Sequence, residues 1–302
     1  MSKQHKSSQV GRCIGRIASC LAVAGLTCVV APAQATQVNL QNFNSLSDFT
    51  LNGATAAINT GGMGVVGPNV GDARVLRLTN NYGQSGSAFL TNSISLASDA
   101  SFSSYFEFQF TNQGGGGADG IVFTVQTVAN TAGGGGGGIG YDGLQKSVGV
   151  EFDNWNNGSC DGNNDNHAGI DIAGNTCSVV RADTLPAVLD SGSIFHAWVD
   201  YNGSTDTLEV RLALNDTRPI AALMSYNVDL VSVLGTTDAF VGFTSGTGAA
   251  TADHDIRRWV FNSTYNPVVD PNNPGGTTVP EPGTLALLAT GLGCLGLRRR
   301  KA

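Results

Sequence analysis

The sequence predicts an all-β protein in which antiparallel strands form a β-sandwich or jelly roll. Strand-like runs are many, helix-like runs are few, and short turns rich in Gly, Asn and Asp separate the runs. Many of the 41 glycines lie in such turns, above all at 114–117 and 133–138. Between the two ends of the chain roughly 230 residues remain, which is enough for one domain with a single core.

Alternation of apolar and polar residues identifies the strands. It is clearest at 105–110 and 208–214, and a period of two is that of a strand with one buried face. One short helical turn is expected at 229–234. In chain order, the expected strands are 74–78, 105–110, 120–128, 147–153, 168–172, 195–201, 208–214, 239–244 and 256–262.

Residues 1–35 are predicted to be a secretory signal peptide. A basic start is followed by an apolar run at 17–30 and by the small-residue cleavage signal Ala33-Gln34-Ala35. The apolar run is short for a membrane anchor, which is the alternative. We therefore expect cleavage before Thr36 and export through the inner membrane.

The C-terminus contains a second targeting segment, at 279–302. Residues 266–278, rich in Pro, Gly and Asn, are predicted to be a flexible linker. Pro280-Glu281-Pro282, the apolar run 284–297 and the basic cluster 298–301 follow in order. This order resembles the PEP-CTERM sorting signal of Gram-negative bacteria. The resemblance implies removal of the tail by an exosortase, only transient membrane contact, and a final location outside the cell, at its surface or in its matrix. A plain C-terminal anchor is the alternative.

The charge of the central region excludes a class of partners. Eight of the 16 Lys and Arg lie in the two targeting segments, so residues 36–278 hold 22 acidic residues against 8 basic ones. A net charge of −14 repels nucleic acid and anionic membranes. Nucleic acid is therefore not an expected partner.

Only two cysteines, Cys160 and Cys177, lie outside the targeting segments. In an exported domain two cysteines most simply form one disulfide. Free thiols or a bridge between chains are the alternatives. Zinc binding is not expected because no second cysteine pair exists.

The most informative stretch is 150–171, which reads VEFDNWNNGSCDGNNDNHAGID. It combines carboxylates, amides and one imidazole on a strand end and the loop that follows. Carboxylate and carbonyl oxygens suit calcium or manganese, and an imidazole suits a transition metal. Glu151 and Asp153 are two residues apart on a strand, so their side chains share a face.

Four separated segments, in their order and spacing, resemble the L-type (legume-type) lectins, including bacterial members. They are Gly117–Ile121 (GADGI), 137–141 (GGIGY), the metal run, and 241–256 with VGFTSGTG at its start. The resemblance covers about 36–265. It implies a concanavalin-like jelly roll and an exported, metal-dependent carbohydrate-binding protein that is not an enzyme. Expected partners are cell-surface glycans or exopolysaccharide.

The resemblance also implies which residues hold the metals. The transition-metal site, usually Mn²⁺, would comprise Glu151, Asp153, Asp161 and His167. The Ca²⁺ site would comprise Asp153, Asn157, Asp161 and the main-chain carbonyl of Trp155. The metals would not act on the sugar chemically. They would hold the loop of the sugar site in place, and they would hold a cis peptide bond between Ala118 and Asp119.

In the sugar site implied by the resemblance, Asp119 accepts hydrogen bonds from two sugar hydroxyls and Asn157 donates one. Gly137 or Gly138 offers a backbone N–H, and the Trp155 ring lies against the apolar face of the sugar. Gly248 and Ala249 belong to the loop that sets sugar preference. A homo-oligomer is left open as a partner, since neither the sugar nor the oligomeric state follows from the sequence.

Asp165, His196 and His254 are the remaining candidates, and each has a structural interpretation. Asp165 matches no ligand and is expected in a turn. His196 is expected to be structural. His254 matches a polar position before the last strand.

Two other functions are alternatives. A laminarinase-type glycosidase needs E-x-D-x-x-E, but Asn156 stands at the sixth position, so the second carboxylate is missing. A structural matrix protein with a decayed site is less consistent with a complete set of ligands.

Overall fold

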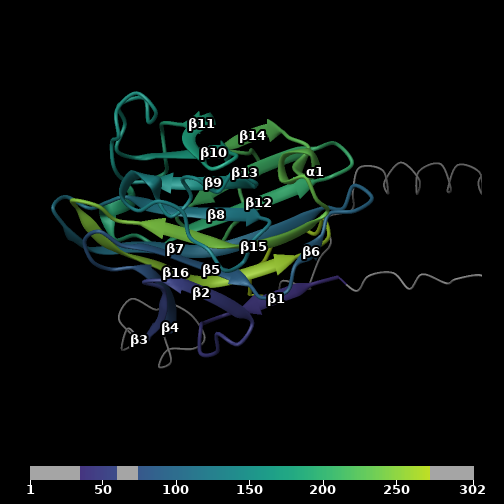
Figure 1. The fold of residues 1–302 in the computed structure, drawn as a ribbon, viewed down its shortest axis with the longest axis horizontal. Helices are drawn as coiled ribbons and strands as arrows, with labels where there is room; N and C mark the ends of the chain where they lie inside the picture. The colour runs from purple at the N-terminus through teal and green to yellow at the C-terminus, as the bar shows by residue number, and fades with distance from the viewer. Residues whose placement is uncertain (1–34, 60–73, 273–302) are drawn as a thin grey trace, which may run out of the picture. The chain divides into compact units, whose positions relative to one another are not determined.

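The computed structural model describes residues 35–59 and 74–272. There the chain forms two antiparallel sheets (Figure 1). In order across sheet A the strands are β14 (Met224–Asn227), β13 (Thr207–Ala213), β12 (Phe195–Asn202), β7 (Phe102–Gly114), β16 (Thr251–Asn262), β4 (Arg74–Thr79) and β3 (Ala56–Asn59), with β1 (Gln37–Leu40) also paired to β16. In sheet B they are β11 (Asn175–Ala182), β10 (His167–Ile172), β9 (Ser147–Asp153), β8 (Gly120–Gln126), β15 (Asp238–Gly246), β5 (Ser85–Leu90) and β2 (Phe49–Gly53), with β6 (Ile94–Ser95) paired to β15.

Helical structure in the described part is limited to short turns. They are η1 (Gly136–Gly138), η2 (Leu189–Ser191) and α1 (Leu230–Leu234). Helix α1 begins where expected, because the Asp229 side chain accepts a hydrogen bond from the Ser232 N–H at 3.0 Å and so caps the first turn. It ends at Gly235, whose φ of +70° is easily reached only by glycine.

The core lies between the inner faces of the two sheets. Phe106 and Phe108 of β7 project toward sheet B, where Phe108 packs on Phe152 of β9 at 4.8 Å between ring centroids. Phe106 meets Phe243 of β15 edge-on at 5.0 Å. The alternation that marked β7 in the sequence is therefore the alternation between this core and the outer face. The predicted β-sandwich is confirmed.

Each expected strand is present, and β9 has the expected bounds. β7 is longer than expected at both ends. The strands that periodicity missed are short, lie at sheet edges or are rich in small and polar residues: β1, β2, β3, β5, β6, β11 and β14.

The prediction of a flexible linker from residue 266 is wrong for its first part. The Trp198 indole N–H donates to the Val268 carbonyl at 2.8 Å, and Val268 is buried against Tyr105 and Trp198. Arg258 donates to the carbonyl of Pro271. The segment has the composition of a linker, but sheet A buries its Val268 side chain and binds the carbonyls of Val268 and Pro271.

The predicted signal peptide and sorting segment lie outside the described residues, apart from residue 35. Within 35–59 and 74–272, no helix is long and apolar enough to cross a membrane.

Strand register brings the candidate loops to one end of the sandwich. Gly120, the first residue of β8, pairs with Asp153 at the end of β9 and with Gly246 at the end of β15. On sheet A, Gly114 at the end of β7 pairs with Thr251. The β7–β8, β9–β10 and β15–β16 connections therefore start from adjacent strand ends (Figure 1).

Candidate metal centre and binding site

The metal candidates on the β9 strand and its neighbour come together as expected. Asp153 pairs with His167, the first residue of β10, and Glu151 lies two residues earlier on β9. One ligand atom from each of these three residues lies within 4.8 Å of the others, and all three are buried. The alternate residues Val150 and Phe152 face the core. Strand alternation thus separates the ligand face from the core face.

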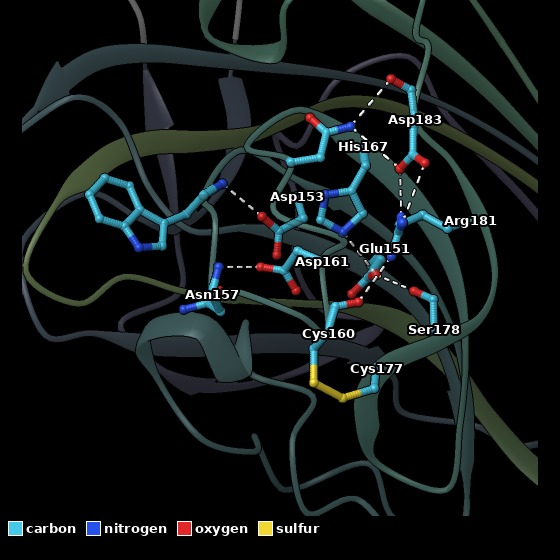
Figure 2. A network of polar contacts seen from close by, with 12 residues as sticks. Glu151, Asp153, Asn157, Cys160, Asp161, His167, Cys177, Ser178, Arg181 and Asp183 are labelled. Atoms are coloured by element: carbon cyan, nitrogen blue, oxygen red, sulfur yellow. Dashed lines mark hydrogen bonds and ion pairs between the residues drawn. A yellow bond between two sulfur atoms is a disulfide. The ribbon is translucent and has the colours of Figure 1, made fainter.

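Asp161 approaches this cluster from the β9–β10 loop. Figure 2 shows its carboxylate beside Asp153, with Glu151 and His167 close by. An Asp161 carboxylate oxygen accepts a hydrogen bond from the Asn157 N–H, and Asp153 accepts one from the Trp155 N–H at 2.7 Å. The carboxylates therefore hold the loop backbone that carries the other predicted ligands.

The electrostatics of the cluster favour a bound cation. Burial, and then the negative charge of Glu151, raise the pKa of Asp153 well above its usual range. Burial also raises the pKa of Asp161, against the effect of the Asn157 N–H. Among described residues, Glu151 Oε2 and His167 Nδ1 are buried without a hydrogen-bond partner. Carboxylates, an imidazole and orphaned polar atoms in one buried place fit a divalent metal ion.

The β9–β10 loop is also fastened to β11. Cys160 and Cys177 form a disulfide, with 4.5 Å between their Cα atoms (Figure 2). The Arg181 guanidinium donates to the Cys160 carbonyl at 3.1 Å and pairs with Asp183 at 2.5 Å. The predicted disulfide is confirmed, and its position beside Asp161 ties the β9–β10 loop to the edge of sheet B.

Asp119 lies just before β8, whose first residue pairs with Asp153 of the carboxylate and imidazole cluster. The Ala118–Asp119 peptide is cis, as the resemblance implied. Its backbone is held on both sides, since the Asp119 N–H donates to Gly246 and its carbonyl accepts from the Asn154 N–H, both at 3.1 Å. Its Oδ2 is buried without a hydrogen-bond partner among the described residues. Burial raises the pKa of Asp119 to about 6, although the Gly248 backbone opposes this.

Glycines let the neighbouring loops approach Asp119 and Asn157. A Cβ added at Gly248 would lie 3.5 Å from Asp119 Oδ2 and 3.2 Å from the Gly136 Cα. A Cβ added at Gly137 would lie 2.6 Å from both Cγ and Oδ1 of Asn157. The structure thus brings the predicted glycine loops against the metal loop.

Trp155, Ala249 and Asp165 lie at the surface of this region. Trp155 is half-buried, and a Cβ added at Gly116 would lie 3.8 Å from the edge of its ring. Ala249 is exposed beside Gly248. Asp165 is exposed in a bend of the β9–β10 loop, where a turn residue was expected.

The sequence did not predict the residues whose hydrogen bonds hold the backbone of Asp119. Asp190 of η2 accepts a hydrogen bond from the Asn154 side chain at 2.8 Å, and a Cβ at Gly117 would collide with its carboxylate. Asn154 in turn holds the Asp119 carbonyl. No motif marks Asp190, because its partners are distant in sequence and meet it only in the fold.

His254 was placed wrongly by the sequence comparison, since it lies inside β16 rather than before it. It is fully buried, and burial lowers its pKa to about 3. Its Nδ1 lies 2.8 Å from the Thr79 hydroxyl, and that hydroxyl lies 2.8 Å from the Ser245 hydroxyl. The Ser245 hydroxyl in turn donates to the Gly120 carbonyl at 2.7 Å. This chain of contacts links both sheets behind Asp119.

Known proteins share this architecture. The legume lectin domain matches residues 36–275, beyond the expected boundary at 265, and the PEP-CTERM protein-sorting motif matches 278–301. The chain is 29% identical over 255 residues to the L-type lectin-domain containing receptor kinase VIII.1 of Arabidopsis thaliana, covering 80% of this chain and 33% of that protein. It is 31% identical over 156 residues to a lectin of Pisum sativum, covering 48% and 55%. The chain therefore spans only about a third of that receptor kinase.

Solved structures agree with the sequence matches. The lectin from Bauhinia forficata in complex with GalNAc superposes with a TM-score of 0.62 at 25% identity, covering 77% of this chain and 99% of that one. The basic winged bean lectin with Tn-antigen gives 0.61 at 27% identity, covering 76% and 98%. Since the domain match takes in well over half of its residues, this chain belongs to the legume lectin domain family and ends in a PEP-CTERM sorting motif.

Proposed function

We propose that this protein is an exported, metal-dependent lectin that binds carbohydrate without transforming it. The observation that carries the proposal is the Asp119 carboxylate, buried beside the metal cluster with one oxygen free of protein partners in the described part of the chain. A buried acceptor without a partner is costly unless a ligand supplies the hydrogen bond. Sugar hydroxyls are donors suited to a carboxylate.

The proposed metal sites divide the ligands by their chemistry. Glu151, Asp153, Asp161 and His167 would hold Mn²⁺ or another transition metal. Asp153, Asn157, Asp161 and the carbonyl of Trp155 would hold Ca²⁺. When bound, the ions would supply positive charge to the crowded carboxylates and hold the β9–β10 loop.

In the proposed sugar site, the Asp119 carboxylate accepts from two hydroxyls and the Asn157 amide donates to the sugar. Of the two predicted donors, Gly137 and Gly138, Gly138 already donates its N–H to the Gly135 carbonyl at 3.2 Å, so Gly137 is the better donor to a ligand. The half-buried Trp155 ring covers the apolar face of the sugar. Gly248 and Ala249 shape the rim.

The sorting motif supports a location outside the cell. We propose export through the inner membrane of a Gram-negative bacterium, processing by an exosortase, and binding to cell-surface or extracellular polysaccharide. Anchoring to the membrane would be transient.

The carboxylate of Asp119 can be tested directly. Asp119→Asn keeps the shape of the side chain but removes its charge, and charge-assisted hydrogen bonds contribute about 1.5–3 kcal/mol each. We expect it to weaken glycan binding by about 10²-fold or more on a glycan array with Ca²⁺ and Mn²⁺. Asp165→Asn, on the exposed bend of the metal loop, is the matched control and should bind like the wild type. Equal binding by Asp119→Asn would refute the proposed role.

A further inference from the structure

Tyr82 is an exposed aromatic residue at the rim of the proposed sugar site. It lies on the β4–β5 loop, and 53% of its surface is exposed. A Cβ added at Gly114 would lie 2.7 Å from the Tyr82 hydroxyl, so the absence of a side chain there lets the tyrosine lean over the end of β7. Gly114 begins the glycine run that leads to Asp119.

The loop that carries Tyr82 is fastened to the rim of the site. Gly83 donates its N–H to the Gly248 carbonyl at 3.1 Å. Gln84 and Thr247 exchange two hydrogen bonds, each of 3.0 Å. The Gln84 side chain accepts from the Asn80 and Asn81 N–H groups at 2.7 and 2.9 Å. Tyr82 is therefore presented by a rigid turn and not by a loose one.

Gly248 lies between the loop that carries Tyr82 and the Asp119 carboxylate. Its carbonyl accepts the hydrogen bond from Gly83, and a Cβ added to it would lie 3.5 Å from Asp119 Oδ2. A Cβ added at Gly116 would lie 3.8 Å from the Trp155 ring. A Cβ added at Gly114, two residues earlier in the same glycine run, would lie 2.7 Å from the Tyr82 hydroxyl. The two aromatic side chains thus contact different positions of the run that leads to Asp119.

We propose that Tyr82 forms a second subsite, which stacks on the pyranose ring next to the one held by Asp119. The ligand is then a glycan chain of at least two sugar units. This inference rests on the proposed function. One face of a pyranose presents C–H groups of partial positive charge, which an aromatic face attracts, and Tyr adds a hydroxyl for the wet rim.

The test compares single sugars with short chains on one array. The probes are the methyl glycosides of glucose, mannose, galactose and N-acetylgalactosamine, together with linear di- and trisaccharides of the same sugars, in Ca²⁺ and Mn²⁺. The best-binding glycoside and its chain are then titrated by calorimetry. The variants are Tyr82→Ala and Tyr82→Phe, which keeps the ring. Ile220→Ala, which removes a side chain that is 98% exposed on the β13–β14 loop, is the control for non-specific binding through an exposed apolar side chain.

Wild-type protein should bind the chain more tightly than the single sugar. Tyr82→Ala should lose roughly three- to tenfold in affinity for the chain and keep its affinity for the single sugar. Tyr82→Phe and Ile220→Ala should keep the preference for the chain. An equal loss for both ligands, or no loss, would overturn the subsite while leaving the lectin function standing. Wild-type protein that binds no probe would overturn the proposed function and the subsite with it.

Discussion

Gly137 offers the sharpest test of the proposed sugar site, because its replacement acts on one neighbour. In Gly137→Ala the new methyl would lie 2.6 Å from Cγ and Oδ1 of Asn157, and closer still to Nδ2. Ordinary contact begins at 3.4 Å, so the amide must move by at least about 0.8 Å. Gly137 does not have a positive φ, so the substitution adds no backbone strain there.

The displaced amide would no longer point its N–H at the sugar, and the methyl would stand in front of the Gly137 N–H. Losing two neutral hydrogen bonds of about 0.5–1.5 kcal/mol each predicts a loss of affinity between roughly 5-fold and 150-fold. The assay is calorimetric titration of the best array sugar into metal-loaded protein, with thermal unfolding to confirm the fold.

Gly134→Ala is the matched control in the same glycine run. Its methyl would meet nothing closer than 3.5 Å, and Gly134 also lacks a positive φ. It should bind sugar like the wild type. Wild-type affinity in Gly137→Ala would refute the placement of Asn157 and Gly137 in the site.

Two further predictions concern stability. The pKa of buried His254 is lowered from 6.5 to about 3, so below pH 6.5 the unfolded chain takes up a proton that the folded chain refuses. The stability contributed by neutral His254 is complete above pH 6.5 and is lost toward pH 3. The free energy of unfolding of the wild type, measured in urea, should therefore fall by about 1.4 kcal/mol per pH unit below pH 6.5 relative to His254→Gln. Parallel curves of unfolding free energy against pH for the two proteins would contradict this. Replacing Cys160 and Cys177 by Ser should cost about 3 kcal/mol of unfolding free energy, because the bond joins residues 17 apart. An unchanged urea midpoint would show that the disulfide does not constrain the chain.

The parts of the site that lie along one strand could be predicted from the sequence. Glu151 and Asp153 share a face because strand side chains alternate, and the spacing to His167 follows from one loop between neighbouring strands. The disulfide also followed, since only two cysteines lie between residues 36 and 278. The cis bond before Asp119 came only from the family resemblance.

The parts that depend on distant segments could not be predicted. Asp190 supports Asn154 from 36 residues away, and Asp190 belongs to no recognisable motif. Tyr82 reaches the rim only because β4 ends and β5 begins beside the β15–β16 turn. The segment after residue 265 has a linker composition, yet Trp198 and Arg258 bind its carbonyls. Such contacts are decided by the fold and not by local pattern.

The central claim is that metal ions organise a sugar site around Asp119 and Asn157. It is tested most directly by glycan-array binding of one preparation in three states: loaded, stripped with EDTA, and reloaded with Ca²⁺ and Mn²⁺. We predict that stripping abolishes binding and that reloading restores it with the same glycan preference. Stripped protein that binds glycans as well as the loaded protein would contradict the claim.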